Sequence, residues 1–282
     1  MAERDCNSTS CSKDSCEGCA SADKSTPQSF LVEPNIYTNV KKVIGIVSGK
    51  GGVGKSMITA SLANQMKQQG YRVGILDADI TGPSIPKMFG LKGPAQGTEE
   101  GIFPEEAQNG TKVMSINLLM EDEEAPVIWR GPVIANMVKQ FWSDVMWGEL
   151  DYLFVDMPPG TGDVPLTVFQ SLPVDGIVVV TSPQDLVSMI VKKAYHMAKT
   201  MNIPIIGIVE NYSYIECPDC GKKIQVFGES HIDEIAADLE LEVLGKVPIR
   251  SEYASAADAG EFYKVNNDYI QKAADKLTGM LA

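Results

Sequence analysis

Apolar runs and amphipathic segments alternate along the chain from Lys41 onward. Uninterrupted runs of branched residues, of which residues 43–47 and 176–181 are the clearest, predict buried strands. Segments such as residues 57–69 carry apolar side chains at helical spacing and predict helices. Strands that alternate with helices are typical of a parallel sheet covered on both faces. The pattern therefore predicts an α/β fold with a doubly wound, mostly parallel sheet.

The same patterns predict the rest of the order of elements. Further strands are expected at residues 72–76, 112–116, 151–157, 203–209 and 243–247, and further helices at residues 129–142, 185–201, 229–239 and 263–281. Residues 90–110 are rich in Gly, Pro and Glu, and we expect them to form an exposed excursion.

Residues 1–34 have a different composition from the rest of the chain. Ser, Asp, Lys and Cys dominate and large apolar residues are almost absent, which predicts a disordered tail before a folded domain of residues 35–282. Four of the six cysteines lie in this tail, at Cys6, Cys11, Cys16 and Cys19. The last two have C-x-x-C spacing, so both sulfurs could reach one metal centre. A metal or cluster role and incidental thiols both remain open here.

Composition narrows the class of protein. The chain has 282 residues, of which 44% are hydrophobic and 22% charged, as in ordinary globular proteins. Its net charge of −13 argues against a nucleic-acid backbone as the main partner. No apolar stretch is long enough to span a bilayer, and the N-terminus lacks the apolar core of a signal peptide. We therefore expect a cytosolic protein that works without membrane or nucleic acid, with reduced thiols.

The stretch Gly49-Lys50-Gly51-Gly52-Val53-Gly54-Lys55-Ser56 is the strongest motif of the chain. It lies between a predicted strand and a predicted helix, which is the setting of a nucleotide-binding P-loop. Glycines let successive N–H groups turn toward an anion, and the helix N-terminus adds partial positive charge. Lys55 is then expected to contact the β- and γ-phosphates of ATP, and the Ser56 hydroxyl to bind Mg²⁺. The contact region for the nucleotide extends to Met57.

Acidic and amide side chains follow the neighbouring strands. Asp77 and Asp79 come after the strand at residues 72–76, and Asp156 ends the next long apolar strand, where a carboxylate fits the role of holding Mg²⁺ through its water shell. The glycine-rich turn at residues 158–162 is placed like a switch loop. Asn211 follows the strand at residues 203–209, where it could read an adenine edge or simply occupy a turn.

Cys217-Pro218-Asp219-Cys220-Gly221 is a second motif with chemical meaning. Such a turn presents two thiolates to one side, which is typical of a metal knuckle. A closed tetrahedral or cluster site usually has four ligands, so this pair is half of a site. The same pair of a second chain, the N-terminal cysteines, or an empty thiol pair remain as alternatives. A two-fold axis would double two cysteines into four.

Taken together, these motifs resemble the Mrp/ApbC family of iron–sulfur cluster carriers, which are ATPases of the MinD/ParA-type deviant P-loop group. The resemblance covers about residues 41–282. It rests on these stretches: residues 49–56, Asp77-Ala78-Asp79-Ile80 with Gly82-Pro83-Ser84, Trp129-Arg130-Gly131-Pro132, residues 156–163 and residues 217–220.

The resemblance implies a function and a set of residue roles. It implies a homodimer in which Lys50 reaches the nucleotide of the other subunit, while Lys55 and Ser56 act within their own chain. It also implies that Asp79, supported by Asp77, orients the attacking water and that Asn211 contacts adenine. The implied cargo is a 4Fe–4S cluster held by Cys217 and Cys220 of two subunits and delivered to apo-proteins. Eukaryotic relatives carry a further four-cysteine N-terminal cluster, from whose spacing this tail departs.

Three other classes compete with this interpretation. A positioning ATPase of the ParA/MinD type would bind DNA or membrane, which the acidic charge and the last helix, with few basic residues, disfavour. A redox protein like the nitrogenase iron protein has widely separated cluster cysteines, unlike the adjacent pair here. An ATPase with a structural zinc knuckle also fits, because thiolates bind zinc as well as iron–sulfur clusters.

Overall fold

The computed structural model describes residues 30–80, 82, 84–120, 131–183 and 187–281. The chain divides into two units, Met1–Phe30 and Leu31–Ala282. Cys6, Cys11, Cys16 and Cys19 lie outside the described residues, as do Trp129, Arg130 and the start of the helix expected at residues 185–201. All of the described helices and strands belong to the second unit.

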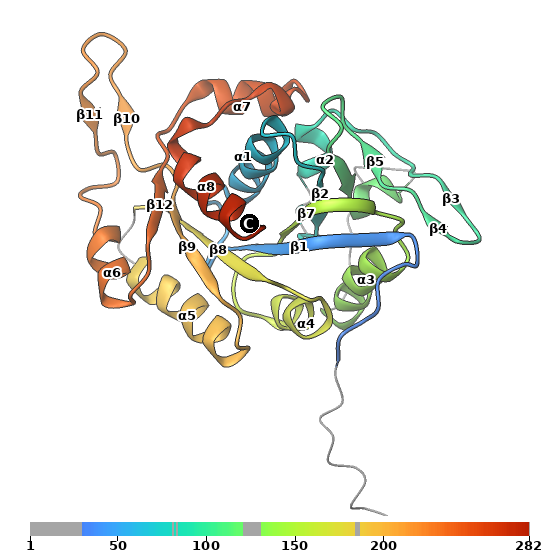
Figure 1. The fold of residues 1–282 in the computed structure, drawn as a ribbon. Coiled ribbons are helices and arrows are strands. Elements are labelled where there is room, and N and C mark those ends of the chain that lie inside the picture. The colour runs from blue at the N-terminus through green and yellow to red at the C-terminus, as the bar shows by residue number, and fades with distance from the viewer. Residues whose placement is uncertain (1–29, 81, 83, 121–130, 184–186, 282) are drawn as a thin grey trace, which may run out of the picture. The chain divides into compact units, whose positions relative to one another are not determined.

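An eight-stranded sheet forms the centre of this unit (Figure 1). Its strand order is β12-β9-β8-β1-β7-β2-β6-β5, and every neighbouring pair is parallel except β5 and β6. The strands are β1 (Thr38–Val47), β2 (Val73–Asp77), β5 (Glu105–Glu106), β6 (Lys112–Met114), β7 (Gly148–Asp156), β8 (Gly176–Thr181), β9 (Ile205–Glu210) and β12 (Val243–Lys246). The predicted α/β fold with a mostly parallel sheet is thus confirmed.

Helices cover both faces of the sheet (Figure 1). One face packs against α1 (Lys55–Gln68), α2 (Ile85–Met88), α7 (Ser251–Asp258) and α8 (Gln271–Gly279), and the other against α3 (Gly131–Ser143), α4 (Asp163–Ser171), α5 (Val187–Thr200) and α6 (Ile232–Asp238). Successive side chains of a strand point to opposite faces. In β7, accordingly, Tyr152 and Phe154 pack into the core on the α1 side of the sheet, while Leu153 and Val155 pack into the core on the α3 side. All four side chains are fully buried. This double burial explains the uninterrupted apolar runs in the sequence.

The arrangement of the central strands places the site. β1 lies between β7 and β8, and the chain leaves its carboxyl end through the glycine-rich loop into α1. In open parallel sheets, ligands bind outside the carboxyl ends of the strands where the strand order reverses. Asp77 and Asp156 end the two strands on one side of this point, and Glu210 ends β9 on the other.

A small antiparallel hairpin carries the two described cysteines. β10 (Ile215–Glu216) and β11 (Lys223–Ile224) pair with each other and extend away from the main sheet (Figure 1). We call residues 213–230 the cysteine hairpin. A second short hairpin, β3 (Gly97–Thr98) with β4 (Gly101–Ile102), lies within the excursion expected at residues 90–110.

The prediction of one helix over residues 263–281 is wrong. The structure has 3₁₀ turns at Phe262–Lys264 and Asp268–Ile270, and α8 begins only at Gln271. Long-range contacts from α1 explain the difference. Gln65 Nε2 donates to the carbonyl oxygen of Asn267 at 2.7 Å, and Asn267 Nδ2 donates to Ser61 Oγ at 3.3 Å. These bonds hold the backbone of Asn267 outside the helical ladder.

Three of the described helices have no counterpart in the sequence-based expectations, α2, α4 and α7. None of the described helices combines the length and the apolar character needed to cross a membrane.

Candidate functional site

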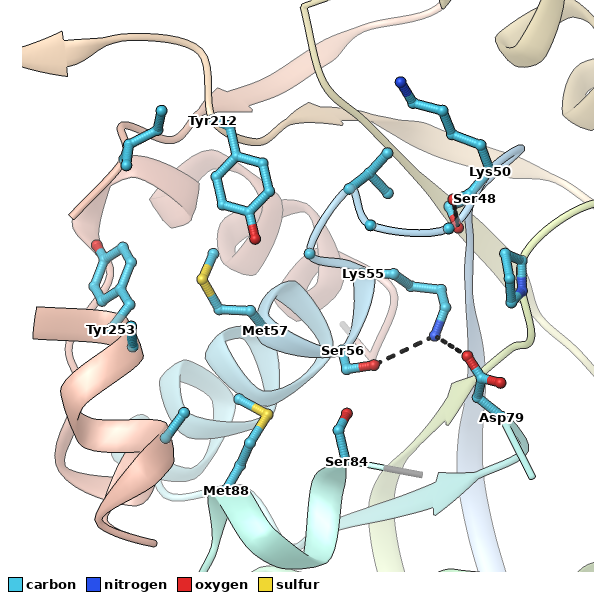
Figure 2. A pocket seen from close by; sticks show the side chains of 18 of the residues that line it. Ser48, Lys50, Lys55, Ser56, Met57, Asp79, Ser84, Met88, Tyr212 and Tyr253 are labelled. Atoms are coloured by element: carbon cyan, nitrogen blue, oxygen red, sulfur yellow. Dashed lines mark hydrogen bonds and ion pairs between the residues drawn. The ribbon is translucent and has the colours of Figure 1, made fainter. Parts of the chain in front are cut away.

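The glycine-rich loop forms the floor of a pocket of about 480 Å³ at the carboxyl end of β1 (Figure 2). Most of the predicted nucleotide-contacting residues line it, together with residues from switch-like and C-terminal segments. The lining residues are Ser48, Lys50, Gly51, Gly52, Val53, Gly54, Lys55, Ser56, Met57, Asp79, Ser84, Met88, Pro159, Tyr212, Ile249, Arg250, Tyr253, Ala254 and Ala257. Ile249 and Arg250, in the loop after β12, thus lie at this edge of the sheet.

Two glycines give the loop a shape that other residues could not adopt easily. Gly52 and Gly54 have φ angles of 77° and 74°, in the left-handed region that favours glycine. A Cβ at Gly54 would lie 2.2 Å from Asn211 Nδ2, whereas one at Gly52 would meet nothing within 4 Å. Gly54 is also the N-cap of α1, whose first N–H groups carry partial positive charge. A curled glycine backbone at a helix N-terminus fits a phosphate chain.

Lys55 is the buried cation of the site. Only 6% of its side chain is exposed, and its Nζ donates to Asp156 Oδ1 at 2.7 Å. Asp79 Oδ2 lies 3.8 Å and Ser56 Oγ 3.4 Å from the same Nζ (Figure 2). One ammonium group thus draws the loop, the carboxyl end of β7 and the segment after β2 together.

Asp156 receives its hydrogen bonds from α1. Besides Lys55, Ser56 Oγ donates to Asp156 Oδ2 at 2.5 Å and Thr59 Oγ1 donates to Asp156 Oδ1 at 2.7 Å. The carboxylate is fully buried. Hydroxyl and carboxylate oxygens are the ligands that Mg²⁺ prefers, directly or through water. The predicted pair of Ser56 and Asp156 therefore meets at one point and fits a magnesium ion.

Asp77 lies deeper than the other carboxylates and is fully buried. It accepts hydrogen bonds from Ser115 Oγ at 3.2 Å, from the backbone N–H of Ile85 at 3.4 Å and from that of Asp79 at 3.2 Å. Burial and the negative charge of Asp156 raise the pKa of Asp77 to about 8, although Lys55 opposes the shift. At neutral pH this group is mostly a protonated acid that packs behind the site.

The raised pKa of Asp77 makes a measurable prediction for Asp77→Asn. Between pH 4 and 8 the folded carboxyl keeps its proton while the unfolded chain, at an ordinary pKa of 3.8, releases it. Raising the pH through this window therefore favours unfolding of the parent chain, by at most about 1.4 kcal/mol per pH unit. The amide cannot ionise, so the stability of the variant lacks this pH dependence. The difference in unfolding free energy, variant minus parent, should therefore increase as the pH rises from 5 to 8. Urea titrations from pH 5 to 8 measure this, and parallel pH profiles of the two proteins would contradict it.

Asp79 and Lys50 lie on opposite sides of Lys55. Asp79 lines the pocket with 15% of its side chain exposed, and its Oδ2 lies 3.8 Å from Lys55 Nζ. The Lys50 side chain points away from Lys55 and from the floor of the pocket (Figure 2). Of the two lysines of the loop, Lys55 is buried against Asp156 and Lys50 extends from the rim of the pocket.

The turn at residues 158–162 contacts the same loop. The backbone N–H of Gly160 donates to the carbonyl oxygen of Ser48 at 2.8 Å, and Pro159 lines the pocket. The expected switch segment is therefore hydrogen-bonded to the start of the glycine-rich loop.

Asn211 lies beneath the loop and is fully buried. Its Nδ2 donates to the carbonyl oxygen of Val53 at 2.9 Å, while its Oδ1 is a buried acceptor with no hydrogen-bond partner among the described residues. The structure thus brings Asn211 to the loop but not onto the pocket wall. Tyr212, the next residue, lines the pocket with its ring (Figure 2).

One wall of the pocket was not predicted from the sequence. Tyr212, Tyr253 and Met88 form this wall beside Met57 (Figure 2). Arg250 and residues of α7 complete it. Aromatic and thioether side chains suit a planar heterocycle better than a phosphate. The signal for α7 was the Ala- and Glu-containing stretch after Pro248, which favours a helix.

Cys217 and Cys220 lie in the turn of the cysteine hairpin. Cys217 is half-buried and Cys220 exposed, and both are free thiols. The carbonyl oxygen of Cys217 accepts from the N–H of Gly221, whose φ is 68°, so the turn closes on itself. The backbone N–H groups of Cys220 and Asp219 lower the pKa of the Cys217 thiol. This favours the thiolate, the form that binds metal.

The two thiols are a partial site within one chain. No group of three or more His, Cys, Asp or Glu side chains that could hold a metal ion occurs among residues the structure describes. The geometry thus places one half-buried and one exposed thiol in the same turn, and any further ligands would come from elsewhere.

Known proteins similar to this chain include iron–sulfur cluster carrier proteins and a nucleotide-binding protein of known structure. Curated relatives include the iron–sulfur cluster carrier protein of Clostridium perfringens, 47% identical over 254 residues (86% of this chain and 89% of that protein). That of Methanocaldococcus jannaschii is 45% identical over 258 residues, covering 85% and 87%. Among solved structures, a nucleotide-binding protein from Archaeoglobus fulgidus in complex with ADP has a TM-score of 0.73 at 44% identity, covering 82% of this chain and 90% of that one.

More distant structures share the fold. The cell division ATPase MinD of Pyrococcus furiosus has a TM-score of 0.60 at 18% identity, covering 85% of this chain and 99% of that one. Residues 39–281 match the ParA-type family described as NUBPL iron-transfer P-loop NTPase. With this match spanning nearly all of the second unit, and with relatives above 40% identity over most of their length, the chain belongs to the iron-transfer P-loop NTPases of the ParA group.

Proposed function

We propose that this chain is an ATPase that carries an iron–sulfur cluster between two copies of itself and delivers the cluster to apo-proteins. One observation carries the proposal: a P-loop pocket and a hairpin turn with two free thiols stand on the same domain. Four thiolates are the usual ligand set of such clusters, and two chains related by a two-fold axis supply four. The curated relatives named iron–sulfur cluster carrier proteins support the cargo.

The nucleotide is proposed to be ATP with Mg²⁺. The backbone of residues 49–56 and the start of α1 at Met57 would hold the phosphates, and Lys55 would neutralise the β- and γ-phosphate oxygens. Ser56 and Asp156 would hold the magnesium shell, which supplies further positive charge to the phosphates. Tyr212 and Tyr253 would enclose the base. Asn211 Oδ1, which has no hydrogen-bond partner among the described residues, would accept a hydrogen bond from the amino group of adenine. This contact requires the base to displace the segment at residues 211–212 slightly.

Hydrolysis needs a positioned water and a stabilised leaving group. Asp79 beside Lys55 is the group proposed to orient the water. Lys50, whose side chain points away from Lys55 in Figure 2, is proposed to reach the phosphates bound by the partner chain, in the manner of an arginine finger. A homodimer is therefore required for both hydrolysis and cluster binding. The net charge of −13 supports a cytosolic protein whose partners are apo-proteins, without nucleic acid or membrane.

Anaerobic reconstitution tests the proposal. The full chain is treated with ferrous iron and sulfide, and its absorption spectrum, iron and zinc content and mass in solution are measured. We expect one 4Fe–4S cluster per two chains and a dimer that separates when the cluster is removed. A protein that stays monomeric with nucleotide, iron and sulfide all present would contradict the proposal. Zinc retained at two thiols per chain, with no iron uptake, would favour a structural knuckle.

Lys50→Ala tests the contribution of the partner chain. Removing a cation that acts only on the transition state should lower the rate of ATP hydrolysis by about 10²-fold or more while nucleotide affinity changes little. The measurement is phosphate release at saturating ATP, alongside nucleotide binding by calorimetry. Mixing this variant with chains in which Lys55 is replaced should restore part of the activity, because one pocket of the mixed dimer then has both lysines. No recovery on mixing would contradict action across the interface.

A further inference from the structure

We propose that the carboxylate of Glu210 is a positioning group that fastens both ends of the cysteine hairpin to the nucleotide pocket. Nucleotide binding then changes the reactivity of Cys217 and Cys220 through this fastening. The inference rests on the proposed function, because it links the two sites that the function requires.

Glu210 joins residues that are distant in sequence. It ends β9 and is 1% exposed. Its Oε2 accepts a hydrogen bond from Ser213 Oγ, just before β10, and its Oε1 accepts one from Ser230 Oγ, after β11, at 2.6 Å. One buried carboxylate therefore holds the outgoing and the returning stems of the hairpin. Burying a carboxylate is unfavourable unless donors satisfy it, so these two hydroxyls and the carboxylate depend on each other.

The part of the hairpin farthest from its stem is exposed. Residues 218–229 are all exposed, and both cysteines lie in or next to this range. The direction in which the thiols point is therefore set mainly at the stem, where Glu210 acts. A small rotation of the stem therefore displaces the exposed turn and the two thiols with it.

The same short segment reaches the nucleotide pocket. Asn211 donates to the carbonyl oxygen of Val53 in the glycine-rich loop at 2.9 Å. Tyr212 lines the pocket and has a φ of 59°, a left-handed conformation that a residue with a side chain holds only when its surroundings enforce it. Three consecutive residues thus contact the hairpin stem, the loop and the pocket.

A second backbone connection lies on the other side of the stem. The N–H of Ser213 donates to the carbonyl oxygen of Val247 at 2.9 Å, and the N–H of Ile249 donates to that of Tyr214 at 2.8 Å. Ile249 itself lines the pocket. The start of the hairpin is therefore flanked by two pocket-lining residues, so a base entering between them would press on the segment that Glu210 holds.

The test measures thiol reactivity in the cluster-free full chain. Alkylation of Cys217 and Cys220 by iodoacetamide is followed by peptide mass spectrometry, which separates them from the four N-terminal cysteines. The rate is compared without nucleotide and with Mg²⁺ and a non-hydrolysable ATP analogue, whose affinity is measured in parallel. In the parent chain we expect the analogue to change the rate by about fivefold or more, the lower range of coupling between two sites.

Variants at the stem separate positioning from folding. Glu210→Ala should reduce the nucleotide effect to less than about twofold, which is below ordinary coupling between sites. Glu210→Gln should restore most of it, because the amide can still bond both serine hydroxyls. Ser230→Ala removes one stem bond at a partly exposed position and should give an intermediate effect if Glu210→Ala does not fold. Glu229→Ala, an exposed carboxylate beside Ser230, is the matched control and should behave as the parent.

Two results would overturn the inference. The first is a folded Glu210→Ala or Ser230→Ala chain that binds the analogue and keeps the full nucleotide effect. The second is a parent chain that binds the analogue with no change in alkylation. Because no cluster is present, a failure of anaerobic reconstitution would refute the proposed cargo while leaving this result to stand by itself. A parent chain that does not bind the analogue would overturn both.

Discussion

Lys55→Ala is expected to lower the rate of ATP hydrolysis by about 10³-fold, because one ammonium group serves both the phosphates and the buried carboxylates. In the structure its Nζ lies 2.7 Å from Asp156 Oδ1 and 3.8 Å from Asp79 Oδ2, with 6% of the side chain exposed. Without it, two carboxylates would face the incoming phosphates with no fixed cation between them. Like charges at this distance oppose binding as well as the transition state.

The same substitution should weaken the fold. Asp156 is fully buried, and removing one partner of a buried ion pair typically costs about 3–5 kcal/mol. Phosphate release with Mg²⁺ and ATP measures the loss of activity, and thermal unfolding of the two chains measures the loss of stability.

The matched control is Lys87→Ala on α2. Lys87 is 74% exposed and pairs with the exposed Asp258 at 3.6 Å, so its removal should change stability by less than about 1 kcal/mol. Hydrolysis by a Lys55→Ala chain at more than a tenth of the parent rate would show that the buried lysine does not act on the phosphates.

The parts of the site that could be predicted are those whose residues lie close together in the sequence, within one short segment. The glycine-rich loop needs its glycines, lysine and serine at fixed spacing, because each group contacts the same phosphate chain. Asp156 follows an apolar strand that must be buried on both faces, so its place at the sheet edge could be inferred from the run before it. The structure accordingly brings Lys55, Ser56 and Asp156 within hydrogen-bond distance of one another.

Other features depend on contacts that no local pattern encodes. The segment before α8 has ordinary helical composition, yet α1 side chains about 200 residues earlier fix Asn267 in another conformation. The base-side wall of the pocket joins Met57, Tyr212 and Tyr253 from three separate segments. Glu210 meets serines three and twenty residues away, of which only the nearer belongs to the same turn. Such groupings follow from the topology of the sheet and were visible only once it was known.

Asp77 shows how burial changes the role of a residue that the sequence places correctly. Its position next to Asp79 suggests a second carboxylate of the site. In the structure it is fully buried behind Asp156, and its pKa is raised to about 8, so at neutral pH it acts mainly as a protonated partner of Ser115. Sequence spacing indicates the location of Asp77, and its burial at the sheet edge determines its charge.

Replacing Cys217 and Cys220 with serine should remove the cluster that two chains share. Serine keeps the shape of the turn, in which the carbonyl oxygen of residue 217 accepts from Gly221, but its hydroxyl does not replace a soft thiolate as a ligand. The lowered pKa of the Cys217 thiol favours ligation in the parent chain at neutral pH. We expect iron and sulfide content at this site to fall by about tenfold or more, since four thiolates normally hold such a cluster.

Oligomeric state gives the second readout for this pair. Because the cluster is proposed to bridge two chains, the serine variant should lose the dimer that reconstitution produces, while still binding ATP with parental affinity. Light scattering coupled to size exclusion under anaerobic conditions, with and without nucleotide, separates a cluster-bridged dimer from a nucleotide-bridged one. Thermal unfolding of the metal-free chains should be nearly unchanged, since both thiols lie in an exposed turn.

The N-terminal cysteines provide the matched comparison. A chain with serine at positions 6, 11, 16 and 19 keeps the hairpin pair intact and should retain the bridged cluster and the dimer. If that chain loses them while the hairpin variant keeps them, the tail holds the cluster and the two-fold arrangement is wrong. If each set is needed for the same cluster, one chain completes its own site and reconstitution should yield a loaded monomer. The three arrangements therefore differ in which serine variant loses iron, and only the bridged arrangement gives a loaded dimer.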